Sequence, residues 1–150
     1  MTWLITGGSG FIGSHLCRNL LEQGHEVFSL DNFSTGKFEN IAGLENTKGF
    51  ESIEGSVLDK ELVKDLISNV DTCFHFAAAV GVQKILDDPI GSLKTNLHGS
   101  ENVIQACSES KVDLVLASTS EIYGKNPTQP LTEDSDRVIG SPLLSRWTYS

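Results

Sequence analysis

The sequence predicts an α/β protein built on a doubly wound parallel sheet, with helices covering both faces in three layers. Three observations support this prediction. Short apolar runs alternate with amphipathic stretches, the apolar runs are nearly continuous, and a glycine-rich turn follows the first of them. Strands buried on both faces read as continuous apolar runs, and right-handed crossovers between such strands wind a sheet in both directions.

The apolar runs are expected to form five strands, separated by helices. The first helix covers residues 11–23, the second carries apolar residues from Leu62 to Val70 at helical spacing, and the third runs from 89 to about 109. The expected strands cover residues 3–6, 26–30, 50–54, 72–77 and 114–117. The expected capping residues are Gly24 after the first helix, Asp59 before the second, and Asp88 with Pro89 at the start of the third.

The amino-acid composition limits the classes of binding partner that we expect for the chain. The chain has 150 residues and a formal net charge of −9. Nucleic acid and anionic membranes both require a basic face, so we expect neither as a partner. No apolar run reaches the ~18 residues of a membrane helix. The N-terminus lacks the basic region of a signal peptide, so the cytoplasm is the expected location. The three cysteines and four histidines lack metal-ligand spacing, and we expect no metal.

The first strand leads into the pattern Gly-x-x-Gly-x-x-Gly, at Gly7, Gly10 and Gly13. Gly7 permits a tight strand-to-helix turn, Gly10 lets the backbone approach a pyrophosphate, and Gly13 lets the helix pack against the strand. The helix start then offers free N–H groups to a diphosphate. This context favours a dinucleotide site, and the alternative is a glycine-rich turn without a ligand. A phosphate-binding P-loop is not favoured, because no Gly-Lys-Ser/Thr follows.

An acidic residue follows at the end of the second strand. Asp31 comes 18 residues after Gly13, where a carboxylate can accept hydrogen bonds from the ribose hydroxyls of adenosine. The same charge would repel a 2′-phosphate, so Asp31 favours NAD over NADP. The alternative is a solvated aspartate at a strand end.

Longer segments carry a family resemblance. They are residues 6–15, 31–36, 75–78, Asn96, 117–124 and 146–149. In order and spacing they resemble the extended short-chain dehydrogenase/reductases, specifically the NAD-dependent nucleotide-sugar epimerase/dehydratase group. The resemblance covers essentially the whole chain and implies a Rossmann-type domain.

The resemblance also implies which residues surround NAD. Small residues at the end of the fourth strand let the cofactor lie close, and Asn96 helps to order this region. Val57 should flank adenine, although Ser56 stands where the family usually has an aspartate that bonds the adenine amino group. The implied cofactor-binding residues are Gly7, Gly10, Phe11, Ile12, Gly13, Asp31, Asn32, Phe33, Ser34, Val57, Phe76, Ala77, Ala78 and Asn96.

The catalytic residues implied by the resemblance are Thr119, Tyr149 and Glu121. The family's tyrosine belongs to a Tyr-x-x-x-Lys motif, whose lysine would fall at position 153, beyond Ser150. That lysine lowers the pKa of the tyrosine, so we expect the 150-residue chain alone to be inactive or nearly so. The alternatives are a turn-capping hydroxyl for Thr119, a capping or ion-pairing carboxylate for Glu121, and a surface side chain for Tyr149.

The implied reaction oxidises a nucleotide sugar at C4. Tyr149, assisted by Thr119, would take the 4-hydroxyl proton while the C4 hydride passes to NAD. Residues 31–36 favour a UDP-sugar 4-epimerase that acts through a 4-keto intermediate. Residues 119–121 are also typical of UDP-glucuronate decarboxylases and of certain nucleotide-sugar dehydratases. Both reactions are therefore kept as alternatives. A non-catalytic NAD-binding module and a reductase that releases NADH are alternatives of other classes.

We expect residues 1–150 to form an incomplete NAD-binding domain that stops before the last strands and lacks the substrate domain. Family members usually dimerise through two helices, here the one near 89–109 and one that begins near Tyr149. The full-length protein is therefore expected to be a homodimer with a nucleotide-sugar partner, a UDP-sugar being favoured. For the fragment we expect an impaired dimer and an exposed apolar patch. The stretch 125–145 is expected to be a long loop.

Overall fold

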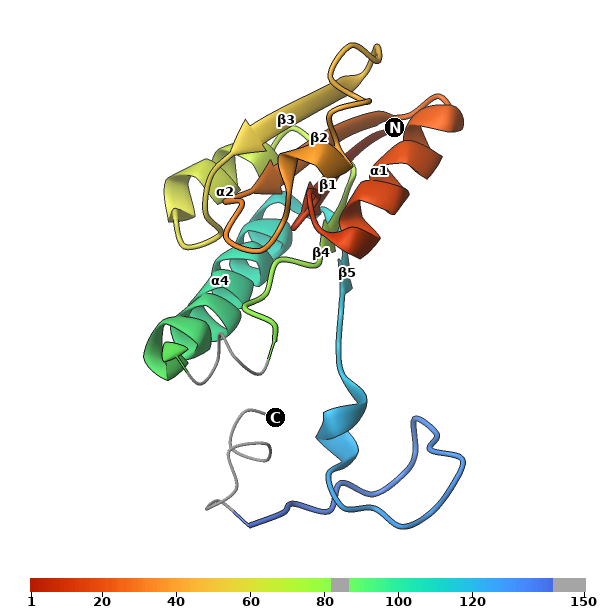
Figure 1. The fold of residues 1–150 in the computed structure, drawn as a ribbon, viewed down its shortest axis with the longest axis vertical. Helices are drawn as coiled ribbons and strands as arrows, with labels where there is room; N and C mark the ends of the chain where they lie inside the picture. The colour runs from red at the N-terminus through yellow and green to blue at the C-terminus, as the bar shows by residue number, and fades with distance from the viewer. Residues whose placement is uncertain (82–86, 142–150) are drawn as a thin grey trace. The chain divides into compact units, whose positions relative to one another are not determined.

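The computed structural model describes residues 1–81 and 87–141, which fall into two compact units. The first unit, residues 1–117, contains the sheet and the α-helices drawn in Figure 1. The second begins at Ser118 and contains a short 3₁₀ helix followed by a loop.

The sheet of the first unit has five parallel strands among the described residues, in the order β3-β2-β1-β4-β5. The chain moves outward from β1 to β3, returns to place β4 beside β1, and then continues outward to β5. The strand order thus reverses between β1 and β4, and the prediction of a doubly wound, Rossmann-type sheet is confirmed. The strands are β1 (Thr2–Thr6), β2 (Glu26–Asp31), β3 (Phe50–Glu54), β4 (Thr72–His75) and β5 (Asp113–Leu116).

Helices cover both faces of this sheet. Figure 1 shows α1 on one side, and α2 and α4 on the other. Successive side chains of a strand point to opposite faces, so β1 contributes to both cores. Leu4 is buried under α2 and α4, whereas Ile5 is buried under α1. The helices are α1 (Phe11–Glu22), α2 (Lys60–Ile67) and α4 (Pro89–Ser110), with the 3₁₀ helices η1 (Phe38–Asn40) and η2 (Ser120–Tyr123). None of the helices in the described ranges is long and apolar enough to cross a membrane.

The helix ends agree with the predicted capping residues. The Asp59 side chain accepts a hydrogen bond from Leu62 N, and the Asp88 side chain accepts one from Gly91 N. Helix α1 ends one residue earlier than predicted, with Gln23 as its cap residue and Gly24 directly after it. The N–H groups of Gly24 and His25 return to the Leu21 and Leu20 carbonyls, the hydrogen-bond pattern of a Schellman motif.

Strand β4 ends two residues before the predicted end, because the Thr6 side chain accepts the hydrogen bond from the N–H group of Ala77. Phe76 N still donates to the Thr6 carbonyl at 3.1 Å, but Ala77 N donates to Thr6 Oγ1, also at 3.1 Å. The chain leaves the sheet from this point.

His75, the last residue of β4, joins β1 and α4 through a buried chain of hydrogen bonds. Its Nδ1 lies 2.7 Å from Thr6 Oγ1, and its Nε2 lies 3.0 Å from Ser100 Oγ. Burial lowers the pKa of His75 to about 4. The ring is therefore neutral at pH 7, and it helps to fix the hydroxyl that holds Ala77.

The second unit is closed by contacts between distant parts of its loop. Lys125 N donates to the Val138 carbonyl at 2.8 Å, and Asn126 Nδ2 donates to the Asp136 carbonyl at 2.7 Å. The predicted loop is confirmed as far as residue 141, the last that the structure describes.

We predict that acid destabilises the chain through His75. The pKa of this ring is about 4 when folded and ~6.5 when unfolded, so between these values the unfolded chain binds a proton that the folded ring excludes. The free energy of unfolding should fall by about 2 kcal/mol between pH 7.5 and pH 5 from this residue alone. Urea titrations of the wild type and His75→Asn at both pH values measure the effect. An equal fall in the free energy of unfolding of the two proteins between these pH values would contradict the prediction.

We predict opposite outcomes for two neighbouring residues of α4. Val103 is fully buried, whereas Ile104 is 45% exposed. Val103→Ala should lower the free energy of unfolding by about 2 kcal/mol through lost apolar burial and a cavity. Ile104→Ala should cost about 1 kcal/mol or less. Denaturant unfolding followed by circular dichroism compares them, and a larger loss at Ile104 would refute the assigned faces of the helix.

Candidate functional site

The glycine turn lies at the carboxyl end of β1, where the strand order reverses. Gly7 N donates to the Leu30 carbonyl at 2.8 Å, which ties the turn to β2. Gly10 N then donates to the Gly7 carbonyl at 3.0 Å, and Ser14 N to the Gly10 carbonyl at 3.0 Å. The turn thus passes directly into α1, and the predicted strand–turn–helix context is confirmed.

Two of the three glycines are required by the packing of the protein itself. Gly7 has a φ of +72°, and a Cβ there would lie 2.8 Å from Ala77 N. A Cβ at Gly13 would clash with the Gly7 carbonyl oxygen and lie 2.8 Å from Gly8 Cα. Neither position accepts a side chain unless the backbone of the glycine turn or of the segment after β4 moves.

Gly10 differs from both of them. Its φ of −73° and ψ of 175° suit any residue, and a Cβ there would approach only the Gly7 carbonyl oxygen, at 3.1 Å. This contact is tight for a Cβ, but it is a milder conflict than those at Gly7 and Gly13. A ligand that lies close to the backbone would add a further reason for a glycine at position 10.

The start of α1 is open to an anion. Gly10 precedes the helix and has no side chain with which to cap it, and the first turn contains no acidic residue. Phe11 and Ile12, the first two helical residues, are 79% and 66% exposed. The first N–H groups of a helix have no partner within the helix and carry a partial positive charge.

Asp31 lies beside this turn and is buried. Its Oδ2 accepts a hydrogen bond from Ser9 N at 2.9 Å, and its Oδ1 accepts one from Phe33 N at 2.9 Å. Only 8% of the residue is exposed. The alternative of a solvated aspartate is therefore wrong. Each carboxylate oxygen retains acceptor capacity for a further donor, such as a ribose hydroxyl.

The residues after Asp31 turn back onto the glycine turn. Asn32 and Ser34 are exposed and joined by a hydrogen bond from Ser34 N to Asn32 Oδ1 at 3.1 Å. Phe33 is half-buried, with a φ of 53°. Further along, Asn40 Nδ2 donates to the Ser9 carbonyl at 2.8 Å. Sequence reasoning did not identify Asn40, since its contact joins residues 31 positions apart and no periodicity marks it.

The segment after β4 borders the same turn. Ala77 lies against Gly7, and Phe76 and Ala77 are half-buried while Ala78 is exposed. Asn96 on α4 holds this segment with both ends of its side-chain amide: Oδ1 accepts from Ala79 N at 2.7 Å, and Nδ2 donates to the Ala79 carbonyl at 3.3 Å. Asn96 therefore orders the backbone here, and any contact of its own with a cofactor stays a prediction.

Val57 is part of the core between the sheet and α4. It is 4% exposed and lies against Gly99, and its carbonyl accepts a hydrogen bond from Asn102 Nδ2 at 3.0 Å. Its predicted place beside adenine is untested.

The predicted catalytic residues belong to the second unit. Thr119 Oγ1 accepts a hydrogen bond from Glu121 N at 3.2 Å and so caps η2. This is the turn-capping role that the sequence left as an alternative, and it leaves the hydroxyl proton free to donate. Glu121 is the second residue of the same short helix, and Tyr149 lies outside the described residues.

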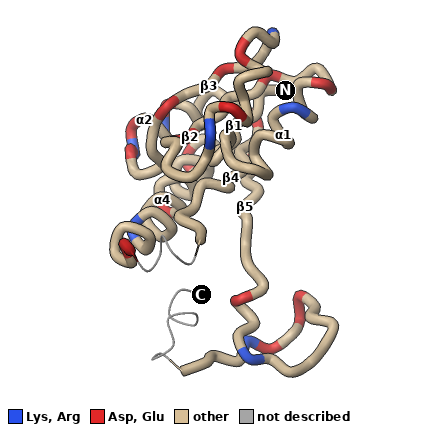
Figure 2. The backbone as a smooth tube through the Cα atoms, in the orientation of Figure 1, with Lys and Arg blue, Asp and Glu red and all other residues tan. Residues whose placement is uncertain are grey.

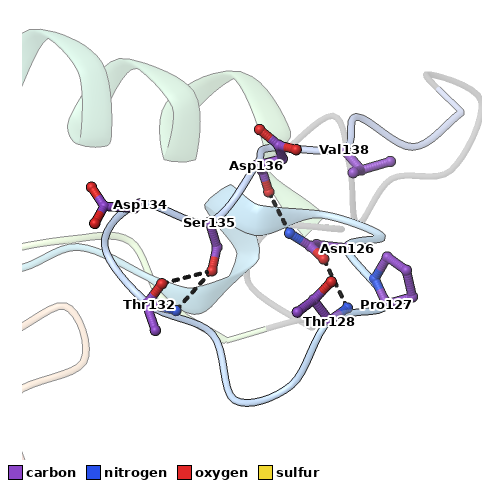
Figure 3. A pocket seen from close by; sticks show the side chains of 8 residues that line it. All are labelled: Asn126, Pro127, Thr128, Thr132, Asp134, Ser135, Asp136 and Val138. Atoms are coloured by element: carbon purple, nitrogen blue, oxygen red, sulfur yellow. Dashed lines mark hydrogen bonds between the residues drawn. The ribbon is translucent and has the colours of Figure 1, made fainter.

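A pocket in the second unit contains none of the predicted residues. Figure 3 shows its polar lining, in which Asn126 bonds Asp136 and Thr128, and Thr132 bonds Ser135. These contacts close the loop on itself.

Charged and metal-binding groups are dispersed. Figure 2 shows Lys and Arg scattered over several elements. Over residues 1–81 and 87–141, no group of three or more His, Cys, Asp or Glu could hold a metal. The cysteines are buried and free, and burial raises the pKa of Cys17, which lies under the glycine turn, to about 12.

Comparison with known proteins agrees with this geometry. The model of the NAD dependent epimerase/dehydratase family matches residues 3–150. The chain is 42% identical over 147 residues to UDP-N-acetyl-alpha-D-glucosaminuronate decarboxylase of Bacillus cytotoxicus, covering 98% of this chain and 45% of that protein. It is 35% identical over 148 residues to UDP-glucose 4-epimerase of Mycolicibacterium smegmatis, covering 97% and 47%.

Solved structures show the same fold. WbmG of Bordetella bronchiseptica, crystallised with NAD and UDP, matches with a TM-score of 0.80 and 38% identity, covering 91% of this chain and 43% of that one. The chain spans about half the length of the curated relatives that it matches. With the family model matched from residue 3 onward and the glycine turn set between β1 and α1 at the reversal of the sheet, this chain belongs to the NAD-dependent epimerase/dehydratase family.

Proposed function

We propose that residues 1–150 supply the NAD-binding part of an enzyme that acts on a nucleotide-linked sugar. The observation that carries the proposal is the surface beside Gly10. A glycine at which a Cβ would approach a single atom, the Gly7 carbonyl oxygen, lies at the uncapped start of α1, beside the buried carboxylate of Asp31. A diphosphate suits the free N–H groups, and a ribose suits the carboxylate.

The charge of Asp31 supports NAD rather than NADP. The carboxylate is fixed by two main-chain N–H groups, so it cannot turn away from a ribose placed next to Ser9. A 2′-phosphate on that ribose would meet a buried negative charge at short range, which is unfavourable.

The proposed substrate is a UDP-sugar and the proposed reaction begins with oxidation at C4. NAD, when bound, would accept the C4 hydride and later return it. Tyr149 would remove the proton of the 4-hydroxyl. Thr119 would assist by donating a hydrogen bond to the same hydroxyl oxygen, since its own proton stays free after it caps η2. Return of the hydride to the opposite face of the 4-keto sugar gives the 4-epimer, and we favour this UDP-sugar 4-epimerase reaction.

Decarboxylation of a UDP-uronic acid is the second candidate. The observation in its favour is that the decarboxylase relative is 42% identical to this chain, against 35% for the epimerase relative. A 4-keto group withdraws electrons from the neighbouring carbons and so assists loss of the C6 carboxylate. Glu121, in η2 and two residues after Thr119, would then act on the proton that replaces the carboxylate.

We also propose that α4 forms the contact between two copies of the protein. Exposed apolar side chains recur along it at spacings of three, four and seven residues, which places them on one helical face. They are Ile90, Leu93, Leu97 and Ile104. Water-exposed apolar rows of this kind mark protein contacts.

We predict that a side chain at position 10 strongly weakens NAD binding while the chain still folds. Gly10→Val should raise the Kd for NAD on the order of 100-fold, because the side chain occupies the space of the diphosphate. The matched control is Gly43→Val, since a Cβ at Gly43 meets no atom within 4 Å. Calorimetry measures binding and circular dichroism the fold. Unchanged NAD affinity in Gly10→Val would refute the proposed site.

We predict turnover of a UDP-sugar by the intact protein, with no accumulation of free NADH. A binding screen against UDP-, GDP- and dTDP-sugars selects the ligand, and NMR identifies the product. A 4-epimer supports the favoured reaction, and a pentose with carbon dioxide supports the second. Thr119→Val should slow either reaction on the order of 100-fold. NAD binding without turnover of any sugar would overturn the enzymatic proposal.

A further inference from the structure

Asn40 connects three parts of the first unit at one point. From η1, its Nδ2 donates to the Ser9 carbonyl of the glycine turn at 2.8 Å. Its own carbonyl accepts a hydrogen bond from Arg18 Nη2 on α1 at 3.3 Å. Lys37 N, three residues earlier, donates to the same Ser9 carbonyl at 3.1 Å. The segment 37–40 is thus attached to the turn through a single oxygen atom.

Ser9 is held from both sides. Its N–H donates to Asp31 Oδ2, and its carbonyl accepts from Lys37 N and Asn40 Nδ2. The residue is fully buried, and a carbonyl oxygen has two lone pairs, so its acceptor capacity is filled. These three bonds leave the residue little freedom to rotate.

The Ser9 carbonyl shares a planar peptide unit with the N–H of Gly10. Fixing the direction of this carbonyl therefore fixes the direction of the Gly10 N–H, which donates to the Gly7 carbonyl at 3.0 Å. Gly10 leads directly into α1, so the peptide plane before it also sets where the helix begins. Asn40 acts on this plane from outside the turn.

The segment that carries Asn40 is itself well defined. Phe33 N donates to Asp31 Oδ1, and the rings of Phe33 and Phe38 lie 6.4 Å apart. Asp31 thus fixes the start of the segment and Ser9 fixes its end.

We propose that Asn40 is a positioning residue for NAD, one that holds the Ser9–Gly10 peptide plane and with it the start of α1, whose first N–H groups would receive the diphosphate. This inference rests on the proposed NAD site. Asn40 acts through Ser9, so its loss should weaken binding of any ligand that contains the ADP half.

The test compares Asn40→Ala with Asn69→Ala in the whole chain. Asn69, just beyond the end of α2, donates from Nδ2 to the Asp65 carbonyl at 2.8 Å, the same length of bond. Asn40→Ala should raise the Kd for NAD and for ADP-ribose about fivefold, mainly through faster dissociation. Amide hydrogen exchange at Gly10 should also accelerate, with the unfolding midpoint without ligand close to that of Asn69→Ala.

The outcomes separate this inference from the proposed function. Selective loss of affinity in Asn40→Ala supports it. Asn40→Asp keeps the shape of the side chain but cannot donate and adds a negative charge, so it should weaken binding at least as much. If the wild type binds NAD and Asn40→Ala binds it as tightly as Asn69→Ala, the inference is overturned and the NAD site stands. Affinity loss that only follows lost stability in both Asn40 variants also overturns it. A wild type that binds neither ligand overturns the proposed function itself.

Discussion

The carboxylate of Asp31 is the constraint on which the candidate site depends. A buried charge is costly unless hydrogen bonds satisfy it, and here the donors are the main-chain N–H groups of Ser9 and Phe33. One side chain therefore fixes the glycine turn on one side and the backbone turn after β2 on the other. Because these donors belong to the backbone, the arrangement depends on the path of the chain.

The central strands β1 and β4 were predictable because their burial requires runs of mostly apolar residues. The edge strands β3 and β5 are mostly exposed, and their prediction depended more on the alternation of strands with helices. Asp59 and Asp88 cap helices as their chemistry suggests. The end of β4 was not predictable, because the Thr6 hydroxyl takes the N–H of Ala77 across 71 positions. The 3₁₀ helix η1 has no periodicity of its own and exists through contacts with the glycine turn.

The residues of the candidate site also fall into those that local sequence spacing predicts and those that it does not. Gly7, Gly13 and Asp31 were found because their roles follow from local spacing, and the structure gives each a physical reason. Asn40 was missed, since an asparagine in an irregular segment has many ordinary explanations in sequence. Thr119 could be placed at the end of a strand by sequence, but only the structure shows its hydroxyl capping η2.

Gly10 differs from Gly7 and Gly13 in how strongly the fold itself requires a glycine. Gly7 and Gly13 would be required in a protein without any ligand, because a Cβ at either position meets backbone. At Gly10 the constraint is weaker, since a Cβ would approach only the Gly7 carbonyl oxygen, and the start of α1 after it has no side-chain cap. A ligand held by main-chain N–H groups would account for an open helix start preceded by glycine. It would also explain how a chain with a net charge of −9 could hold a diphosphate, since helix-end amides supply the positive potential that a cluster of Lys or Arg would otherwise provide.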